Sequence, residues 1–244
     1  MTVSPALFRR FYPDTSRSGT IFFYGWMRRE CAQPYRALNL GAGPGDLSGS
    51  ENFTIRDMRC ARGTVSGCDP DPEVLKNAEL DEALVMERPG VIPFPDESFE
   101  VVYSDYVLEH VEFPKLFFAE VWRVLKPGGS FFFRTPNAWH YVSIAARLLP
   151  HWVHRHVANR VRGLSADAHE PYPTYHRMNT RRTLRRLCVE AGFRDLEVVM
   201  FEGEPSYLMF GALAFLAGVA YERAVNSNSL ASDLRSNIIG RATK

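Results

Sequence analysis

The sequence predicts an α/β fold, with a doubly wound, Rossmann-like sheet covered by helices on both faces. Short apolar segments typical of strands alternate with segments of helical spacing, which is the pattern of crossover units and a parallel sheet. The segment 36–40, the first of these strands, runs directly into a glycine-rich turn at 41–45. Ligands bind at such strand ends in doubly wound sheets. We therefore expect one domain, residues 1–244, organised around a single sheet.

The strands and helices are expected in the following order. Strands are predicted at 36–40, 64–68, 99–103, 130–134, 196–201 and 237–242. Helices are predicted to begin at Pro72, to span 116–125 and to span 181–190, where Thr180 is the N-cap and Gly192 follows the end. Lys126-Pro127-Gly128-Gly129 is expected to stop the second of these helices. Residues 138–180 show no clear strand pattern and are predicted to be a helical insertion after the fifth strand.

Composition excludes several classes of protein. Hydrophobic residues make up 45% and charged residues 23% of the 244, which is typical of a globular chain and not of a disordered one. Twenty-nine Lys and Arg against 28 Asp and Glu give a net charge of +1, so no global field favours nucleic acid. The four cysteines lie far apart, which argues against a disulfide framework and a zinc knuckle. The N-terminus lacks the layout of a signal peptide, and we expect a cytoplasmic, reduced protein.

The glycine turn is Gly41-Ala42-Gly43-Pro44-Gly45. Glycine accepts a positive φ and lets a ligand approach the backbone without a Cβ in the way. A dinucleotide site requires G-x-G-x-x-G, but the sixth residue here is Asp46, which disfavours a dehydrogenase. The turn alone is a weak signal, because glycine turns commonly follow strands.

Asp69 lies at the end of the next predicted strand. In doubly wound sheets an acid at this place accepts hydrogen bonds from ribose hydroxyls, which a carboxylate does with both oxygens. The alternative is that Asp69-Pro70-Asp71 only caps the helix that follows. Together with the glycine turn, we favour the ribose role.

These segments resemble a class I S-adenosylmethionine-dependent methyltransferase of the small-molecule type. The resemblance covers residues 36–137 and keeps the order and intervals of the family. It is carried by Leu38 to Gly45, Gly67-Cys68-Asp69, Ile92 to Val102, Val107-Leu108-Glu109-His110-Val111, and Arg123 to Gly129. The resemblance implies a seven-stranded mixed sheet whose last strand is antiparallel. It also implies that 1–35 is an N-terminal cap segment, 36–137 the cofactor-binding core, 138–180 the acceptor-pocket insertion and 181–244 the closing helices and strands.

The cofactor implied by the resemblance is S-adenosyl-L-methionine. Carried over position by position, the turn would contact its methionine end, Asp69 with Pro70 its ribose, the region of Ile92 its adenine, and Ser104 the methionine again. The implied cofactor-binding residues are Gly41, Ala42, Gly43, Gly45, Asp69, Pro70, Ile92 and Ser104. Two positions depart from the family: Asn39 stands where an acid is frequent, and Arg88 lies where an acid frequently meets the adenine amine.

The acceptor side is expected after residue 137. His140 is the candidate general base, because histidine titrates near neutrality and follows a strand end; the alternative is a histidine that only packs. Asp105 is a second candidate base or a helix cap, and His110 is expected to pack beside the cofactor. Tyr141, Tyr175 and Arg177 are the candidate acceptor-binding residues.

No metal site is expected. His151, His154 and His156 have no acid or cysteine nearby to complete a zinc set. Residues 151–186 hold eight arginines against two acids, which suits a phosphate or carboxylate ligand or, equally, a solvated helix face.

The most apolar stretch, 205–221, is predicted to be a helix. Its length of 17 residues touches the lower limit for a membrane span, but Pro205, Ser206 and two glycines dilute it. We favour a helix buried against the core or a subunit, and keep as alternatives a membrane-interface helix or a helix that lines an apolar substrate pocket.

The predicted function is transfer of a methyl group to a small-molecule acceptor, with an oxygen on a sugar, a lipid-linked compound or a secondary metabolite favoured over nitrogen or carbon. Two alternatives remain open. One is a nucleic-acid methyltransferase, supported only by the arginines, so no nucleic acid is expected as a partner. The other is a non-catalytic, cofactor-binding or membrane-associated scaffold that uses 205–221.

Overall fold

The structure is a computed structural model, which describes residues 3–14, 17–31, 34–45, 55–61, 63–148 and 173–244. The chain divides into two compact units. We call the first the helical unit; it takes in 1–19, 136–173 and 200–237. The second, the sheet unit, takes in 20–135, 174–199 and 238–244.

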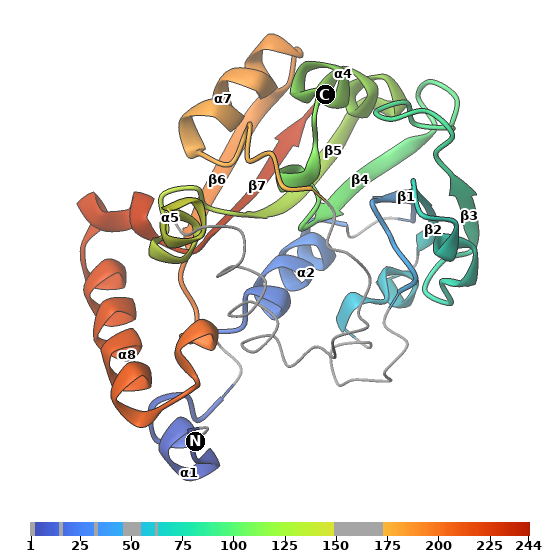
Figure 1. Ribbon diagram of the computed structural model, residues 1–244. Coiled ribbons are helices and arrows are strands. Elements are labelled where there is room, and N and C mark those ends of the chain that lie inside the picture. Colours follow the sequence, from blue (N-terminus) through green and yellow to red (C-terminus); the bar gives the residue numbers. More distant parts are fainter. Residues whose placement is uncertain (1–2, 15–16, 32–33, 46–54, 62, 149–172) are drawn as a thin grey trace. The chain divides into compact units, whose positions relative to one another are not determined.

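Seven strands form one sheet in the order β3-β2-β1-β4-β5-β7-β6 (Figure 1). The strands are β1 (Tyr35–Leu40), β2 (Gly63–Asp69), β3 (Glu82–Val85), β4 (Phe99–Asp105), β5 (Leu125–Pro136), β6 (Arg194–Phe201) and β7 (Asn237–Thr243). β1 pairs in parallel with β2 and β4, β2 with β3, and β4 with β5, whereas β7 is antiparallel to β5. The predicted seven-stranded mixed sheet with an antiparallel last strand is confirmed.

Alternation along β5 explains why helices cover both faces of the sheet. Phe131 packs edge-on against Phe118 of α4 (Pro114–Val124), with ring centroids 5.9 Å apart. Its neighbour Phe132 points to the other face, where its ring lies 5.8 Å from Trp26 of α2 (Gly19–Glu30). Successive strand residues face opposite sides, so the run of three buried phenylalanines at 131–133 requires cover on both. Figure 1 accordingly shows α4 and α2 on opposite sides of the sheet.

The sheet differs from expectation at two places. The predicted stop at 126–129 ends α4 but is itself part of β5, because the Gly128 N–H donates to Lys244 O at 3.1 Å and the Lys244 N–H donates to Gly129 O at 2.9 Å. β3 was not predicted, since only three consecutive apolar residues mark it. The helix expected from Pro72 is only the 3₁₀ turn η2 (Pro72–Lys76).

The remaining elements of the sheet unit are short or peripheral. They are η1 (Met58–Ala61), η3 (Leu108–His110) and α7 (Arg181–Glu190). α7 begins as predicted, because the Thr180 hydroxyl accepts the Thr183 N–H at 3.1 Å.

The helical unit is built around α8 (Ala212–Ser227). Phe215 of α8 is fully buried and packs with Val3, Tyr12 and Val219. The other described elements are α1 (Pro5–Phe11), α5 (Tyr141–Leu148), η4 (Ser206–Leu208) and η5 (Ser229–Leu234). The predicted helix at 205–221 therefore starts at residue 212, after a 3₁₀ turn. No described helix is both long and apolar enough to cross a membrane.

Candidate functional site

The glycine turn follows β1, and three of its residues have the left-handed backbone that glycine favours. The φ angles are 77° at Gly41, 53° at Gly43 and 77° at Gly45. A Cβ on Gly41 would lie 2.4 Å from Cγ2 of Val107, so this glycine is required by packing. A Cβ on Gly43 would meet no atom of the described residues within 4 Å. The space over Gly43 is therefore open to a ligand.

Asp69 at the end of β2 is tied to the turn by a hydrogen bond. Its Oδ2 accepts the Gly43 N–H at 3.0 Å, and its Oδ1 accepts the Asp71 N–H at 2.8 Å. A carboxylate has about four acceptor positions, so each oxygen keeps one for a further donor. Burial raises the pKa of Asp69, and the two N–H donors oppose the rise. Pro70, which follows, is exposed.

Asn77 holds the turn from its other side. Its Nδ2 donates to Ala42 O at 3.2 Å and to Gly43 O at 3.1 Å, while its Oδ1 accepts the Glu79 N–H at 2.9 Å. A Cβ on Gly45 would lie 2.5 Å from Asn77 Oδ1, so Gly45 makes room for this clamp. The sequence analysis missed Asn77, and no motif marks it; only its place after a predicted helix start could have suggested a turn residue.

Ser104 lies at the carboxyl end of β4, and its side chain is fully buried. Among the residues that the structure describes, none hydrogen-bonds its hydroxyl. A buried hydroxyl without a partner costs free energy, and such groups commonly meet a ligand or water. Because β4 pairs with β1, Ser104 belongs to the same edge of the sheet as the glycine turn.

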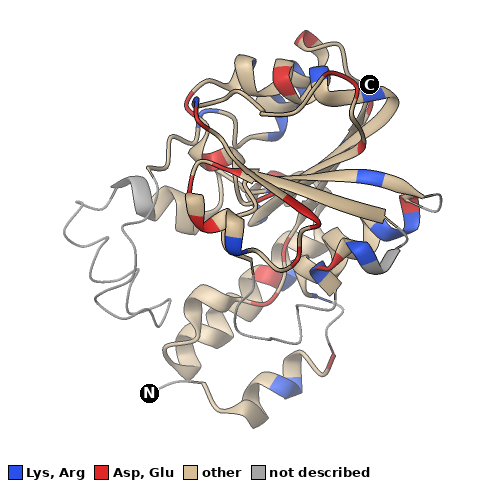
Figure 2. Cartoon of the chain, turned by 90° about the vertical axis from the view of Figure 1, so that its right-hand side faces the viewer, with Lys and Arg blue, Asp and Glu red and all other residues tan. Residues whose placement is uncertain are grey.

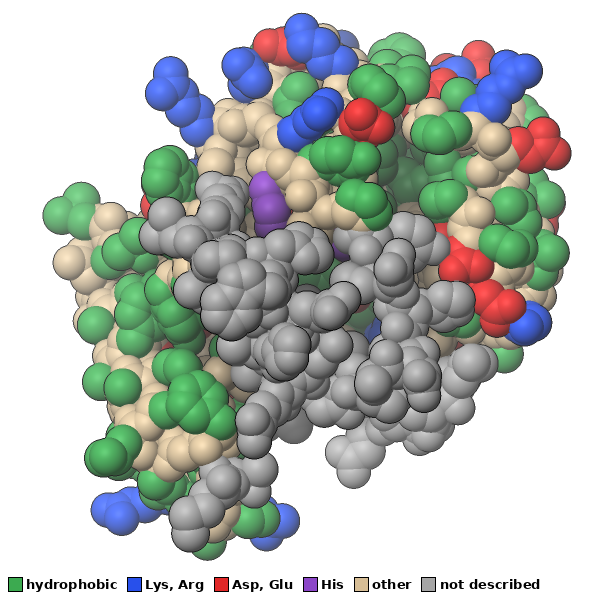
Figure 3. Space-filling view, in the orientation of Figure 1, with side chains coloured by type: hydrophobic (Ala, Val, Ile, Leu, Met, Phe, Trp, Pro, Cys, Tyr) green, Lys and Arg blue, Asp and Glu red, His purple; other side chains and the backbone are tan. Residues whose placement is uncertain are grey.

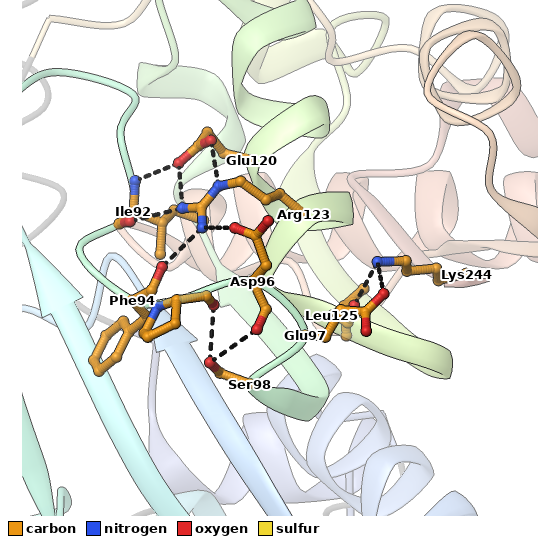
Figure 4. Close-up of polar contacts among 10 residues, drawn as sticks. Ile92, Phe94, Asp96, Glu97, Ser98, Glu120, Arg123, Leu125 and Lys244 are labelled. Carbon is orange, nitrogen blue, oxygen red and sulfur yellow. Dashed lines mark hydrogen bonds and ion pairs between the residues drawn. The ribbon is translucent and has the colours of Figure 1, made fainter.

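The backbone around Ile92 is anchored by an ion pair on α4 (Figure 4). Glu120 accepts the Ile92 N–H at 2.9 Å, and Arg123 donates to Ile92 O and Phe94 O, both at 2.9 Å. Arg123 also holds Glu120 and Asp96 at 2.7 Å. The hydrogen bond from Arg123 lowers the pKa of Glu120. The segment predicted to flank the adenine is thus a loop whose backbone is held by the side chains of Glu120 and Arg123. No function for these two side chains could be predicted from the sequence.

Asp105, weighed above as a base or a cap, is an ion-pair partner. Arg134 Nε and Nη2 donate to its two oxygens, both at 2.6 Å, and Tyr24 donates to Oδ2 at 3.2 Å. Both charged side chains are nearly buried. A carboxylate whose two oxygens are both engaged by a guanidinium is poorly placed to contact a substrate. Asp105 therefore has a structural role here.

Tyr175 and Arg177 lie against the segment that follows β4. The Tyr175 N–H donates to Glu109 O at 2.8 Å, Arg177 donates to Glu112 O at 2.5 Å, and its guanidinium lies 5.2 Å from the centre of the Tyr175 ring. The Glu109 carboxyl accepts from Thr135 at 3.1 Å, and burial raises its pKa. Tyr175 is thus joined to the family-like segment 107–111, and Arg177 to Glu112, the residue that follows this segment.

His140 and Tyr141 belong to the helical unit. His140 is buried, with its ring 4.1 Å from that of Tyr141, and its Nε2 is 3.7 Å from Oε2 of buried Glu202. Burial lowers the pKa of His140 to about 4 and raises the pKa of Glu202 to about 7. The imidazole is therefore neutral at pH 7. His151, His154 and His156, which are not expected to bind a metal, lie outside the described residues.

The comparisons with known proteins agree with this geometry. Residues 38–133 match the family model described as "Methyltransferase domain". An uncharacterized methyltransferase of Schizosaccharomyces pombe is 35% identical over 109 residues, covering 38% of this chain and 37% of the relative. The chain thus spans well under half the length of this curated relative.

Solved structures show the same fold. A methyltransferase of Thermotoga maritima aligns over 98% of this chain and 99% of its own, with 16% identity and a TM-score of 0.52. Phosphoethanolamine N-methyltransferase 2 of Haemonchus contortus, solved with S-adenosyl-L-methionine, aligns over 99% of this chain and 60% of its own, with 18% identity and a TM-score of 0.52. Residues 38–133 therefore match a methyltransferase domain, and the chain shares the fold of these S-adenosylmethionine-dependent methyltransferases.

Two alanine substitutions in the glycine turn should have different consequences. Gly43→Ala adds a methyl group to open space at a positive φ, so we expect a loss of about 1 kcal/mol in stability but abolished cofactor binding. Gly41→Ala drives its methyl group into Val107, so we expect a larger loss, about 2 kcal/mol or more. Urea unfolding and calorimetry with S-adenosylhomocysteine measure both effects. Unimpaired binding by Gly43→Ala would place the ligand elsewhere.

The buried His140–Glu202 pair predicts opposite pH dependences. The native state keeps the Glu202 proton up to its pKa of about 7 and the unfolded chain only to 4.5, so this group's stabilisation falls as pH rises from 4.5 to 7. His140, with a native pKa of about 4 against 6.5 unfolded, stabilises increasingly as pH rises from 4 to 6.5.

In urea unfolding, stability relative to native should therefore rise with pH for Glu202→Gln and fall for His140→Gln, by about 1 kcal/mol per pH unit. Parallel curves for the native protein and both variants would contradict the buried pair.

Proposed function

We propose that the protein transfers a methyl group from S-adenosyl-L-methionine to a small-molecule acceptor. One observation carries the proposal: the segment that matches the methyltransferase model also contains the open glycine turn, Asp69, Ile92 and Ser104. Four predicted cofactor contacts thus lie in the matched region and in one structural unit.

The chemistry of the chain's own groups fits this cofactor. Asp69 keeps two acceptor positions for ribose hydroxyls, and the unpartnered Ser104 hydroxyl suits the polar methionine end. None of the described residues places a side chain over Gly43, so a ligand could approach its backbone directly. Asn77 and the Glu120–Arg123 pair keep these groups in place before any ligand arrives.

S-adenosylmethionine supplies a methyl group on a sulfonium, which is already activated for in-line displacement. The protein's contribution is then mainly positioning. Holding the acceptor and the methyl group in near-attack geometry lowers the activation free energy by about 7–11 kcal/mol. A general base adds about 10²–10⁴-fold, and only where the nucleophile loses a proton. Binding and orientation by the chain are the larger effect.

The acceptor that the side chains favour has an anionic group and some apolar bulk. Arg177 and Tyr175 offer a guanidinium beside an aromatic ring, a pair that holds a phosphate or carboxylate together with a ring or chain. We favour an oxygen nucleophile on a sugar, a lipid-linked compound or a secondary metabolite, with Tyr141 as a further contact. An arginine such as Arg177 can bind the anionic group of a small molecule, so its presence does not require a nucleic-acid substrate.

His140 is the proposed general base. Burial keeps the imidazole neutral at pH 7, which is the form that accepts a proton, although its pKa of about 4 makes it a weaker base than an ordinary histidine. Glu202 lies 3.7 Å from its Nε2 and would stabilise the imidazolium after proton transfer.

Calorimetry with S-adenosylhomocysteine tests the cofactor site. Asp69→Asn keeps the size of the side chain but removes the charge, so we expect the Kd to rise about 10–100-fold. Asp71→Asn is the matched control, since Asp71 caps η2 by accepting the Glu73 N–H at 2.9 Å. Absence of binding by the native protein, or equal effects of the two variants, would contradict the proposed site.

Formation of S-adenosylhomocysteine with a panel of sugar, lipid-linked and phenolic acceptors tests the reaction. With an acceptor that turns over, His140→Gln should lower kcat about 10²–10⁴-fold and leave the Kd for S-adenosylhomocysteine within about twofold. Turnover that is unchanged would reject His140 as the base. Cofactor binding without turnover on any acceptor would favour the non-catalytic alternative.

A further inference from the structure

The outer face of α8 is apolar, although helices at protein surfaces normally present polar side chains there. Five exposed residues recur at helical spacing along one side, and we call them the α8 stripe. They are Leu213, Leu216, Ala217, Ala220 and Ala224. Leu213 is 86% exposed. The opposite side of α8 is also apolar, with Phe215, Val219 and Val225 buried, so the helix is hydrophobic nearly all round.

The stripe continues beyond the N-terminal end of the helix. Tyr207 and Phe210 are exposed large aromatic residues just before α8, and Phe210 is 61% exposed. From Leu213 to Ala224 the stripe is about 17 Å long, at about 1.5 Å per residue. Figure 3 shows hydrophobic side chains gathered over α8 at the left of the view.

Positive charge lies on α1, the helix that packs against α8. α1 packs against the first turns of α8, where the rings of Phe8 and Phe11 lie 6.0 and 5.9 Å from that of Phe215. Arg9 and Arg10 of α1 are exposed, and no ion pair involves either of them among the described residues. In Figure 2 the helix that begins beside the N label carries this positive segment.

Negative charge is absent from the same surface of the two helices. Their one acid, Glu222, is fully buried, where it pairs with Arg17 and accepts from Asn226 at 2.7 Å. Arg223, beside it on α8, is exposed but forms an ion pair with Glu222 at 3.4 Å. Among the described residues, this leaves the two arginines of α1 as the unpaired cations of the two helices. Exposed cations next to an exposed apolar stripe complement an anionic, amphipathic partner.

We propose that the helical unit docks on the surface of anionic lipid membranes, with the α8 stripe in the headgroup–acyl boundary and Arg9 and Arg10 against lipid phosphates. No described helix is long and apolar enough to cross a membrane, so the mode is peripheral. Aromatic residues such as Tyr207 and Phe210 are favoured at this depth. A second copy of the chain fits less well, because two leucines and three alanines offer far less than the roughly 800 Å² per partner of a stable interface.

Vesicle flotation tests the proposal, with pure phosphatidylcholine compared with phosphatidylcholine containing phosphatidylglycerol. We expect the native protein to float only with the anionic vesicles, and salt to weaken the interaction. Leu213→Glu combined with Leu216→Glu should lower the partition coefficient at least about tenfold. Arg9→Gln combined with Arg10→Gln should lower it about tenfold on anionic vesicles.

Val189→Glu on α7 is the matched control, because it adds the same charge at an apolar side chain that is 70% exposed in the sheet unit. It should float like the native protein. Thermal melting of all variants tests whether the α8 stripe is exposed to solvent. If it is, the melting temperatures of the stripe variants should lie within a few degrees of that of the native protein.

Undiminished flotation of the stripe variants would overturn the proposal. So would a native protein that binds no vesicles and elutes as a dimer that Leu213→Glu dissociates. A large fall in melting temperature for the stripe variants would assign the face to the protein's own interior. Vesicle binding is measured without cofactor or acceptor, so neither result bears on the proposed methyl transfer.

Discussion

The candidate site depends on one hydrogen bond, from the Gly43 N–H to the carboxylate of Asp69. It joins the ends of two neighbouring strands, and parallel pairing of Leu40 with Cys68 brings these ends together. The Gly41 N–H donates to Cys68 O at 2.8 Å and reinforces the same junction. The carboxylate that is free to accept ribose hydroxyls is therefore the one that also shapes the turn. Any change that moves Asp69 would therefore disturb two of the proposed cofactor contacts at once.

The sheet unit supports this junction with groups of quite different kinds. Asn77 fixes the carbonyls of the turn, whereas the Glu120–Arg123 pair fixes the backbone around Ile92. On the acceptor side, the Thr135 hydroxyl links the Glu109 carboxyl to the side chain of Asn179, which donates to it at 2.6 Å. Polar networks of this type are costly when broken, because each buried group loses its partner. Here they hold loop segments that lack the regular backbone hydrogen bonds of a strand in place at the edge of the sheet.

The sequence was sufficient for the parts of the fold that local pattern controls. The central strands are apolar runs, and the glycine turn and Asp69 follow strand ends, so their places could be predicted. β3 and the first residues of β5 could not, because their pairing partners lie elsewhere in the chain and Lys126-Pro127-Gly128-Gly129 looks like a simple helix stop. Asn77 and Arg123 act through contacts with backbone atoms, which no spacing rule reveals. Asp105 looked like a free acid because its partner, Arg134, lies on the next strand.

The position of β7 has a consequence for how the chain is made. β6 has β7 as its neighbour in the sheet, between itself and β5. During synthesis, residues 194–201 emerge well before 237–243, so for a time β6 has no strand to pair with and exposes an open edge. Open edges recruit other strands. A nascent chain of this protein is thus most exposed to aggregation in the interval between these two segments, and that is the interval in which a chaperone would have the most to protect.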